Sequence, residues 1–145
     1  LTVSEEDGLL VALDWGRSPF QEKTPLLAEA KDQLDAYFDG DRRAFDLPLA
    51  PQGTAFQKKL WAALQNIPYG EVATYGALAE QLHSHARAIG MACGRNPLPI
   101  LIPCHRVLAA NGTLTGYSGG DGIETKAALL RLEGASFKDT EPRLF

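Results

Sequence analysis

The first third of the chain changes from short apolar runs to a helical spacing of apolar residues. Apolar runs at 1–3 and 9–15 predict two short strands, and the polar residues 5–8 predict the turn between them. Thr24, Pro25 and Gly40 frame a helix, because threonine caps helix starts, proline suits the first turn and glycine follows helix ends. The apolar face of this helix comprises Leu26, Leu27, Ala30, Leu34, Tyr37 and Phe38.

Residues 45–49 predict an edge strand that Pro48 and Pro51 close off. Residues 1–52 are thus expected to form a small α/β domain, and residues 50–53 are expected to link it to the rest of the chain.

Beyond this linker, helical spacing recurs in short segments. Thr54 and Gln57 form a capping box that opens a helix to about residue 66. Thr74 caps a short helix over 75–82, and Ser84 or His85 leads into another over 86–93, which is rich in small residues. Two short helices joined by a few residues, the second with a basic side chain near its start, fit a helix-turn-helix.

The last third predicts a hairpin and one more helix. Asn111-Gly112 lies between the extended runs 106–110 and 113–115, and this dipeptide favours a two-residue turn in which both residues have positive φ. A hairpin placed after a helix-turn-helix forms a wing. A final helix is predicted over 124–133 and ends at Gly134. Residues 53–145 are therefore expected to form an α-rich winged helix-turn-helix domain.

A proline-rich apolar segment precedes the residues with the most chemical potential. Prolines at 97, 99 and 103 exclude a helix interior and a central strand, because proline has no backbone N–H. The segment is also too apolar for an ordinary surface loop. It predicts a buried, rigid, irregular stretch that presents Cys104 and His105 at a fixed place.

Charge is distributed unevenly along the chain. Residues 1–52 carry a net charge of −6 and residues 53–145 a net charge of +2, which fits a polyanionic partner for the second half only. No apolar run is long enough for a membrane-spanning helix, and no secretory leader is evident, so no membrane partner is expected. Two cysteines do not suggest a disulfide framework, and we expect free thiols in the cytoplasm.

Each candidate residue also has an ordinary structural interpretation. A nucleophilic Cys104 needs a base or a positive environment, which His105 and Arg106 are able to supply, but a buried cysteine is often only a small apolar residue. Cys93 has only that second interpretation. His83 and His85 have no cysteine or acidic partner at zinc-site spacing, so no metal site is expected.

The sequence around Cys104 is similar to the active-site signature of the O6-alkylguanine-DNA alkyltransferases, which are also called methylated-DNA–protein-cysteine methyltransferases. The signature covers Pro103–Val107, and the similarity extends over about residues 53–135. Further matching segments, in the family's order, are Ile67–Val72, Thr74–Tyr75, Arg87–Gly90, Arg95–Pro97, Gly116–Gly120 and Lys126–Gly134. Residues 1–52 resemble the family's N-terminal domain, a ribonuclease H-like remnant, only in outline.

The resemblance implies irreversible, single-turnover transfer of an alkyl group from O6-alkylguanine, and of methyl from O4-methylthymine as a second substrate, to Cys104 without a cofactor. His105 then acts as the base, through a water, and Glu133 orients the imidazole. Asn96 braces the turn that carries the cysteine. Glu133 lies at the C-terminal, negative end of the predicted helix, where an acidic side chain is unfavourable. This position also favours a functional reason for the residue.

The resemblance also implies how alkylated DNA is held. Tyr75 assists rotation of the nucleotide out of the duplex, and Arg87 fills the gap that the nucleotide leaves. Tyr117, Ser118 and Gly119 belong to the loop that closes over the extruded base. Ala86 and Gly90 lie on a helix whose small residues permit close approach to the minor groove of double-stranded DNA. The resemblance also implies that the protein acts as a monomer.

Two departures and two rival functions accompany this resemblance. The turn between Tyr75 and Arg87 is slightly shorter than is common in the family, and the loop after Gly120 is longer than in vertebrate members.

One rival is a cysteine hydrolase with a Cys104–His105–Glu133 triad. The other is a non-catalytic, lesion-binding relative of the alkyltransferases, which the presence of Cys104 disfavours.

Overall fold

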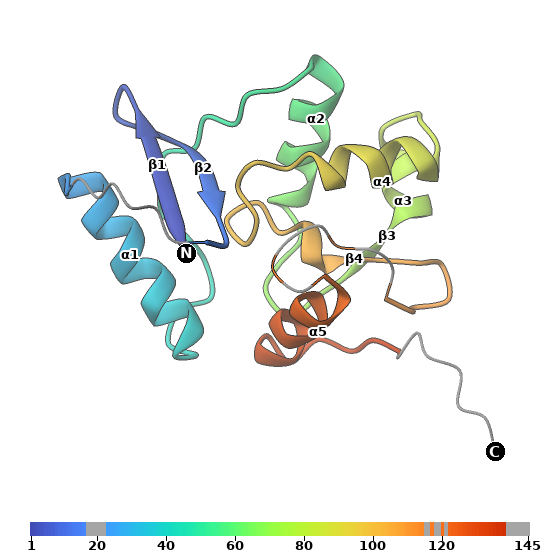
Figure 1. Cartoon of the computed structure of the whole chain (residues 1–145). Coiled ribbons are helices and arrows are strands. Elements are labelled where there is room, and N and C mark those ends of the chain that lie inside the picture. The colour runs from blue at the N-terminus through green and yellow to red at the C-terminus, as the bar shows by residue number, and fades with distance from the viewer. Residues whose placement is uncertain (17–22, 115–116, 118–119, 121, 139–145) are drawn as a thin grey trace.

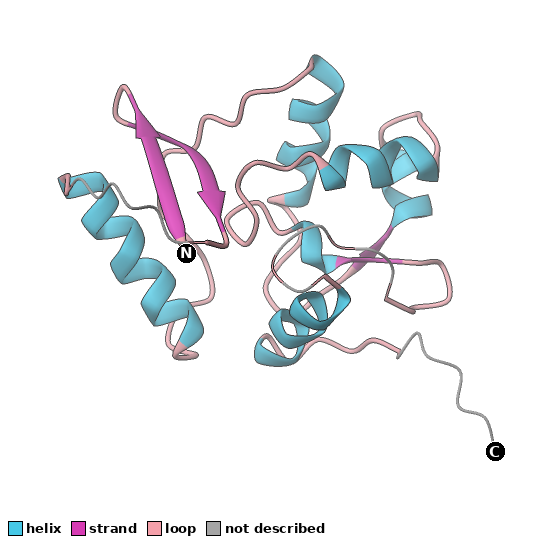
Figure 2. Ribbon diagram, in the orientation of Figure 1, coloured by secondary structure: helices cyan, strands magenta, loops and turns pink. Residues whose placement is uncertain are grey.

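The computed structural model describes residues 1–16, 23–114, 117, 120 and 122–138. Its N-terminal part is an antiparallel hairpin with one helix against it, and its C-terminal part gathers four helices around two very short strands and a 3-10 helix (Figures 1 and 2). In chain order the elements are β1 (Thr2–Glu6), β2 (Leu9–Asp14), α1 (Pro25–Phe38), α2 (Ala55–Leu64), β3 (Ala73–Thr74), α3 (Tyr75–Gln81), α4 (Ala86–Gly94), η1 (Cys104–Arg106), β4 (Val107–Leu108) and α5 (Ile123–Leu132).

The first hairpin is longer than the sequence predicts. Strand β1 continues to Glu6, and the turn consists of Asp7 and Gly8 alone, with φ of 51° and 78°. Two left-handed residues form the two-residue turn whose twist matches that of the strands. The predicted turn over 5–8 is wrong at its first two residues: acidic side chains are common in turns, but this half-exposed ribbon accommodates Glu5 and Glu6 as strand.

Helix α1 begins as predicted and covers the hairpin. Thr24 Oγ1 accepts a hydrogen bond from the Leu27 amide at 3.1 Å, and Pro25 occupies the first turn. Gln33 is buried on the packed face and exchanges two hydrogen bonds with the backbone of Asp46. The predicted edge strand over 45–49 is reduced to a single parallel bridge between Leu10 and Leu49, because this side chain occupies hydrogen-bonding groups of the segment.

The pair of helices α3 and α4 has the predicted caps. Thr74 Oγ1 accepts from the Ala77 amide at 3.0 Å, and His85, one of two predicted candidates, caps α4 through Nδ1 and the Ala88 amide at 3.2 Å. The capping box of Thr54 and Gln57 opens α2.

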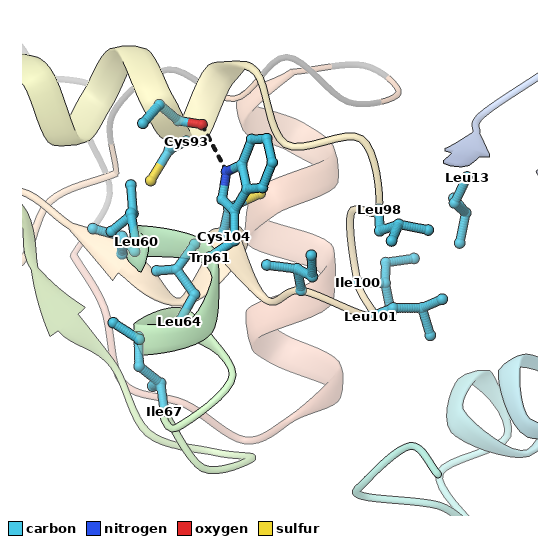
Figure 3. Packing of buried hydrophobic residues seen from close by; sticks show 14 of the residues in the cluster. Leu13, Leu60, Trp61, Leu64, Ile67, Cys93, Leu98, Ile100, Leu101 and Cys104 are labelled. Atoms are coloured by element: carbon cyan, nitrogen blue, oxygen red, sulfur yellow. Dashed lines mark hydrogen bonds between the residues drawn. The ribbon is translucent and has the colours of Figure 1, made fainter. Parts of the chain in front are cut away.

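Trp61 on α2 anchors α4 from below: its indole N–H donates to the Ala92 carbonyl at 3.0 Å, the dashed line in Figure 3. Because Trp61 and other residues of α2 belong to the core, this bond fixes the orientation of α4 relative to the core.

The wing follows the prediction only in part. The chain reverses at Asn111-Gly112, but only Gly112 has positive φ (82°), and Ala109 N donates to Thr113 O at 3.1 Å. This is a three-residue loop with glycine in the left-handed position rather than the predicted two-residue turn. Strand β4 pairs in parallel with β3, a partner that the sequence does not predict, and Thr113 forms a parallel bridge with Lys138. Residue 115 lies outside the described residues.

A continuous apolar core joins the two parts of the molecule. Leu98, Ile100 and Ile102 of the proline-rich segment are at most 1% exposed and pack in one cluster with α2 and with residues of the hairpin. Figure 3 shows Leu13 of β2 pointing toward Leu98 and Leu101. The Leu13 amide donates to the Pro97 carbonyl at 2.8 Å, so the hairpin contacts the segment that leads to Cys104.

Candidate active site

Asn96 closes the proline-rich segment into a compact loop. Its side-chain oxygen accepts from the Leu98 amide at 2.9 Å, and its Nδ2 donates to the Ile102 carbonyl at 2.8 Å. The Ile102 amide also donates to Leu98 O at 2.8 Å. Ile100 takes a φ of 73°, which is rare for a β-branched residue and marks a strained backbone at this site. The segment is therefore buried and irregular, as the prolines predict, and Asn96 braces it, as the resemblance implies.

Pro103 turns the chain directly before the cysteine. With φ of −80° and ψ of 65° it forms a three-residue turn, in which the Cys104 amide donates to the Ile102 carbonyl at 2.8 Å. The same carbonyl accepts from Asn96, so the position of Cys104 depends on one oxygen with two donors.

Cys104 begins η1 and is 7% exposed, at a pocket of about 780 Å³. Burial raises the pKa of the thiol, whereas a hydrogen bond from Asn96 and the positive charge of Lys126 act in the opposite direction. The predicted site residues that line this pocket come from α3, α4, η1 and the loop before α5, and they are Tyr75, Ala86, Arg87, Gly90, Cys104 and Tyr117. Ser118 and Gly119 lie outside the described residues.

His105 is fully buried and is held by one nitrogen. Its Nε2 lies 2.8 Å from Glu133 Oε2, and its Nδ1 is buried with no hydrogen-bond partner among the described residues. Burial lowers the pKa of His105, and the hydrogen bond to Glu133 only partly opposes this effect. In the neutral imidazole, an Nε2–H that donates to the carboxylate leaves Nδ1 with a lone pair. That nitrogen is therefore able to accept a proton.

Glu133, the residue that follows α5, accepts four hydrogen bonds. They come from His105 Nε2, from Arg106 Nε at 2.8 Å and NH2 at 3.0 Å, and from the Tyr37 hydroxyl at 2.6 Å. Burial alone raises the pKa of this carboxyl, but these donors outweigh burial and lower it to about 2. Glu133 is therefore an anion whose proton affinity is held down by its neighbours.

Arg106 has a different function from the one the sequence suggested. Adjacency to Cys104 made it a source of positive charge for the thiol, but its guanidinium forms a buried pair with Glu133 and donates to the Ile67 carbonyl at 2.6 Å. The correction has a physical reason: three successive residues of a 3-10 helix project in different directions, so neighbours in sequence do not share an environment.

Sequence reasoning missed two side chains near the site. Lys126 is fully buried on α5, with Nζ 3.4 Å from the Tyr75 hydroxyl and 5.6 Å from the centre of that ring. Its position on the apolar face of α5, beside Ala127 and Leu130, is a signal that could have found it. The sequence predicts Tyr37 only as a residue of the apolar face of α1, and no local signal connects it with Glu133, 96 residues later.

The chain matches family models over nearly all of its length. Residues 1–51 match the 6-O-methylguanine DNA methyltransferase ribonuclease-like domain, and residues 55–135 match the DNA binding domain of the same family.

Curated relatives agree with these models. The chain is 50% identical to a methylated-DNA–protein-cysteine methyltransferase of Methanosarcina acetivorans over 116 residues, which are 79% of this chain and 73% of the relative. It is 46% identical to the constitutive enzyme of that name in Bacillus subtilis over 144 residues, which are 96% of this chain and 84% of the relative.

A solved structure shares the fold. The crystal structure of Mycobacterium tuberculosis OGT in complex with DNA superimposes with a TM-score of 0.80 and 43% identity, and the match covers 91% of this chain and 84% of that one. Sequence, domain models and fold thus agree: the chain belongs to the methylated-DNA–protein-cysteine methyltransferase family.

Proposed function

We propose that this DNA-repair methyltransferase takes the alkyl group from O6 of guanine in double-stranded DNA onto the sulfur of Cys104 and keeps it. The observation that carries the proposal is the position of Cys104 at an open pocket beside a buried His105–Glu133 pair. A thiol whose pKa is raised by burial needs a base, and the unpartnered Nδ1 of His105 is the nitrogen that fits this role, through one water.

The reaction is a displacement at the alkyl carbon. The Cys104 thiol gives its proton to His105, the sulfur forms a bond to the alkyl carbon, and the C–O6 bond breaks with its electron pair going to guanine. Guanine then takes up a proton, for which the Tyr75 hydroxyl at the pocket is the donor in this proposal. The thioether product has no good leaving group, so each molecule acts once.

The DNA contacts of the proposal are supported by the residues that line the pocket. O6 of guanine is inaccessible inside a stacked duplex, so the nucleotide rotates out, and its base enters between α3 and α4. Ala86 and Gly90 on α4 are small, which suits close approach to the minor groove, and Arg87 is exposed at the start of this helix, where it is able to occupy the gap. Tyr117, with Ser118 and Gly119, covers the extruded base.

Three broader statements belong to the proposal. Residues 1–52 and 53–145 are its two domains, and the protein acts as a monomer. It works in the cytoplasm, where the free thiols of Cys93 and Cys104 stay reduced. No helix in the described part of the chain is long and apolar enough to cross a membrane.

Intact-mass measurement after incubation with a duplex containing O6-methylguanine tests the proposal. We expect one added methyl per protein molecule, no addition in Cys104→Ala, and the normal addition in Cys93→Ala, whose thiol lines the same pocket. A duplex with O4-methylthymine tests the second substrate. Retention of the DNA without any mass gain would indicate a lesion-binding protein, and repeated hydrolysis of esters or amides without mass gain would indicate a hydrolase.

A further inference from the structure

A polar atom of the N-terminal domain, the Tyr37 hydroxyl, lies in the interior of the active site. Tyr37 lies in the last turn of α1, its side chain is fully buried, and its hydroxyl donates to Glu133 Oε2 at 2.6 Å. Figure 1 shows α1 and α5 in separate halves of the molecule, so this bond links the halves at the carboxylate that holds His105.

The hydroxyl is held in a fixed direction by aromatic packing. The ring centre of Tyr37 lies 5.4 Å from that of Phe45 and 6.1 Å from that of Tyr69, the latter edge-on. A buried tyrosine hydroxyl needs a partner, and here the partner is an anion, which makes the bond stronger than one to a neutral group.

Glu133 Oε2 is shared by three donors. Besides Tyr37, it accepts from His105 Nε2 and from Arg106 NH2, at 2.8 Å and 3.0 Å. Each donor draws electron density from the same oxygen, so the bond from Tyr37 weakens the attraction of the carboxylate for the proton on His105.

We propose that Tyr37 is a positioning residue for the His105–Glu133 pair, so that the N-terminal domain takes part in alkyl transfer through a single hydroxyl. The inference rests on the proposed function, in which His105 must be neutral to accept the thiol proton. Tyr37 touches neither the substrate nor the sulfur and acts only through Glu133.

The charged groups that face His105 act in two directions. Glu133 raises its pKa, whereas the positive charges of Arg106 and Lys126 lower it, in addition to burial. Loss of the Tyr37 hydroxyl leaves all of these groups in place and strengthens only the effect of Glu133. The pKa of His105 therefore rises in Tyr37→Phe, and less of the imidazole is neutral at a given pH.

The first test is the pH dependence of alkyl uptake from free O6-benzylguanine. In Tyr37→Phe the acid limb of the profile moves to higher pH by about half a unit, which corresponds to a loss of about threefold in rate below the midpoint. Tyr69→Phe is the matched control, because it removes a hydroxyl that donates to the Leu132 backbone carbonyl at 3.1 Å and not to the carboxylate. The control keeps the wild-type midpoint.

A substitution of opposite sign separates this effect from simple destabilisation. Fluorotyrosine at position 37 has a more acidic hydroxyl, donates a stronger hydrogen bond and moves the midpoint to lower pH. An unshifted midpoint in both variants, or an equal shift in Tyr69→Phe, would overturn the inference.

The second test does not depend on alkyl transfer. Nitrogen-15 spectra of the imidazoles, with His83 and His85 identified by substitution, report the Nε2–H of His105 directly. We expect its proton to resonate farther downfield in Tyr37→Phe than in the wild type or in Tyr69→Phe, because the bond to Glu133 becomes stronger. A wild-type protein that takes up no alkyl group would refute the proposed function, whereas an unchanged Nε2–H signal in Tyr37→Phe would refute this inference alone.

Discussion

Arg106 and Glu133 form a two-pronged ion pair that is closed to solvent, with side chains 8% and 0% exposed. The nitrogens Nε and NH2 bind one carboxylate oxygen each, at 2.8 and 3.0 Å. Since Oε2 also binds His105, the guanidinium and the imidazole compete for the same anion. The pair thus joins η1 to the end of α5 and also sets how strongly His105 is supported.

Glu133→Gln is expected to lower stability as well as the rate of alkylation. The substitution leaves the buried charge of Arg106 without its counterion, and breaking a buried pair on one side costs about 3 kcal/mol or more. Urea denaturation measures this loss directly. Glu124→Gln, an exposed acid in the first turn of α5, is the control and should stay within about 0.5 kcal/mol of the wild type. A loss below 1 kcal/mol for Glu133→Gln would contradict the pairing described here.

The same carboxylate predicts a pH dependence of stability. Its pKa is about 2 in the folded protein and near 4.5 when unfolded, so its contribution is complete above pH 4.5 and is lost as the pH falls toward 2. The full contribution amounts to about 3 kcal/mol. The difference in unfolding free energy between the wild type and Glu133→Gln should therefore shrink steadily from pH 5 to pH 3. A difference that is independent of pH would show that the carboxylate is not responsible.

Asn96→Ala tests the brace around the proline-rich segment. Loss of the two hydrogen bonds leaves the Leu98 amide and the Ile102 carbonyl with fewer partners, and we expect a stability loss of about 2 kcal/mol. Alkylation should slow at least tenfold, because the Ile102 carbonyl that Asn96 holds also accepts the hydrogen bond from the Cys104 amide. Asn111→Ala removes a comparable turn contact to Thr113 in the wing and should leave the alkylation rate at the wild-type value. Equal rates for both variants would argue against a bracing role.

Arg87→Ala separates contacts to the duplex from the chemistry. Arg87 is exposed at the start of α4 and lines the pocket mouth, so its loss should slow repair of a duplex lesion at least tenfold and leave reaction with free O6-benzylguanine within twofold. Lys59→Ala, which removes an exposed positive charge on α2, controls for the general loss of charge. Equal losses on the two substrates would refute the gap-filling role.

Helix starts could be predicted from the sequence because their causes are local. Thr24, Thr54 and Thr74 each bind an amide three residues later, and that spacing is visible in the chain itself. The bracing by Asn96, which the resemblance to the alkyltransferases implied, also spans only a few residues. These signals place α1 to α4 and the loop before Cys104.

The remaining contacts could not be predicted because they depend on the tertiary fold. The bond from Tyr37 to Glu133 and the pairing of Arg106 with the same residue join segments that meet only after folding. The pairing of β4 with β3 has the same origin, since nothing at 107–108 distinguishes a partner at 73–74 from one at 113–115.

The hydrogen bond from the Leu13 amide to the Pro97 carbonyl limits how the two halves can be recombined. The hairpin thus contacts the loop that presents the nucleophile. In a hybrid enzyme that joins a foreign N-terminal domain to residues 53–145, the Pro97 carbonyl keeps its hydrogen bond only if the foreign second strand places a backbone amide where Leu13 has one. Grafts at this boundary should therefore be designed around the end of β2, and the linker at 50–53 is the easier part to replace.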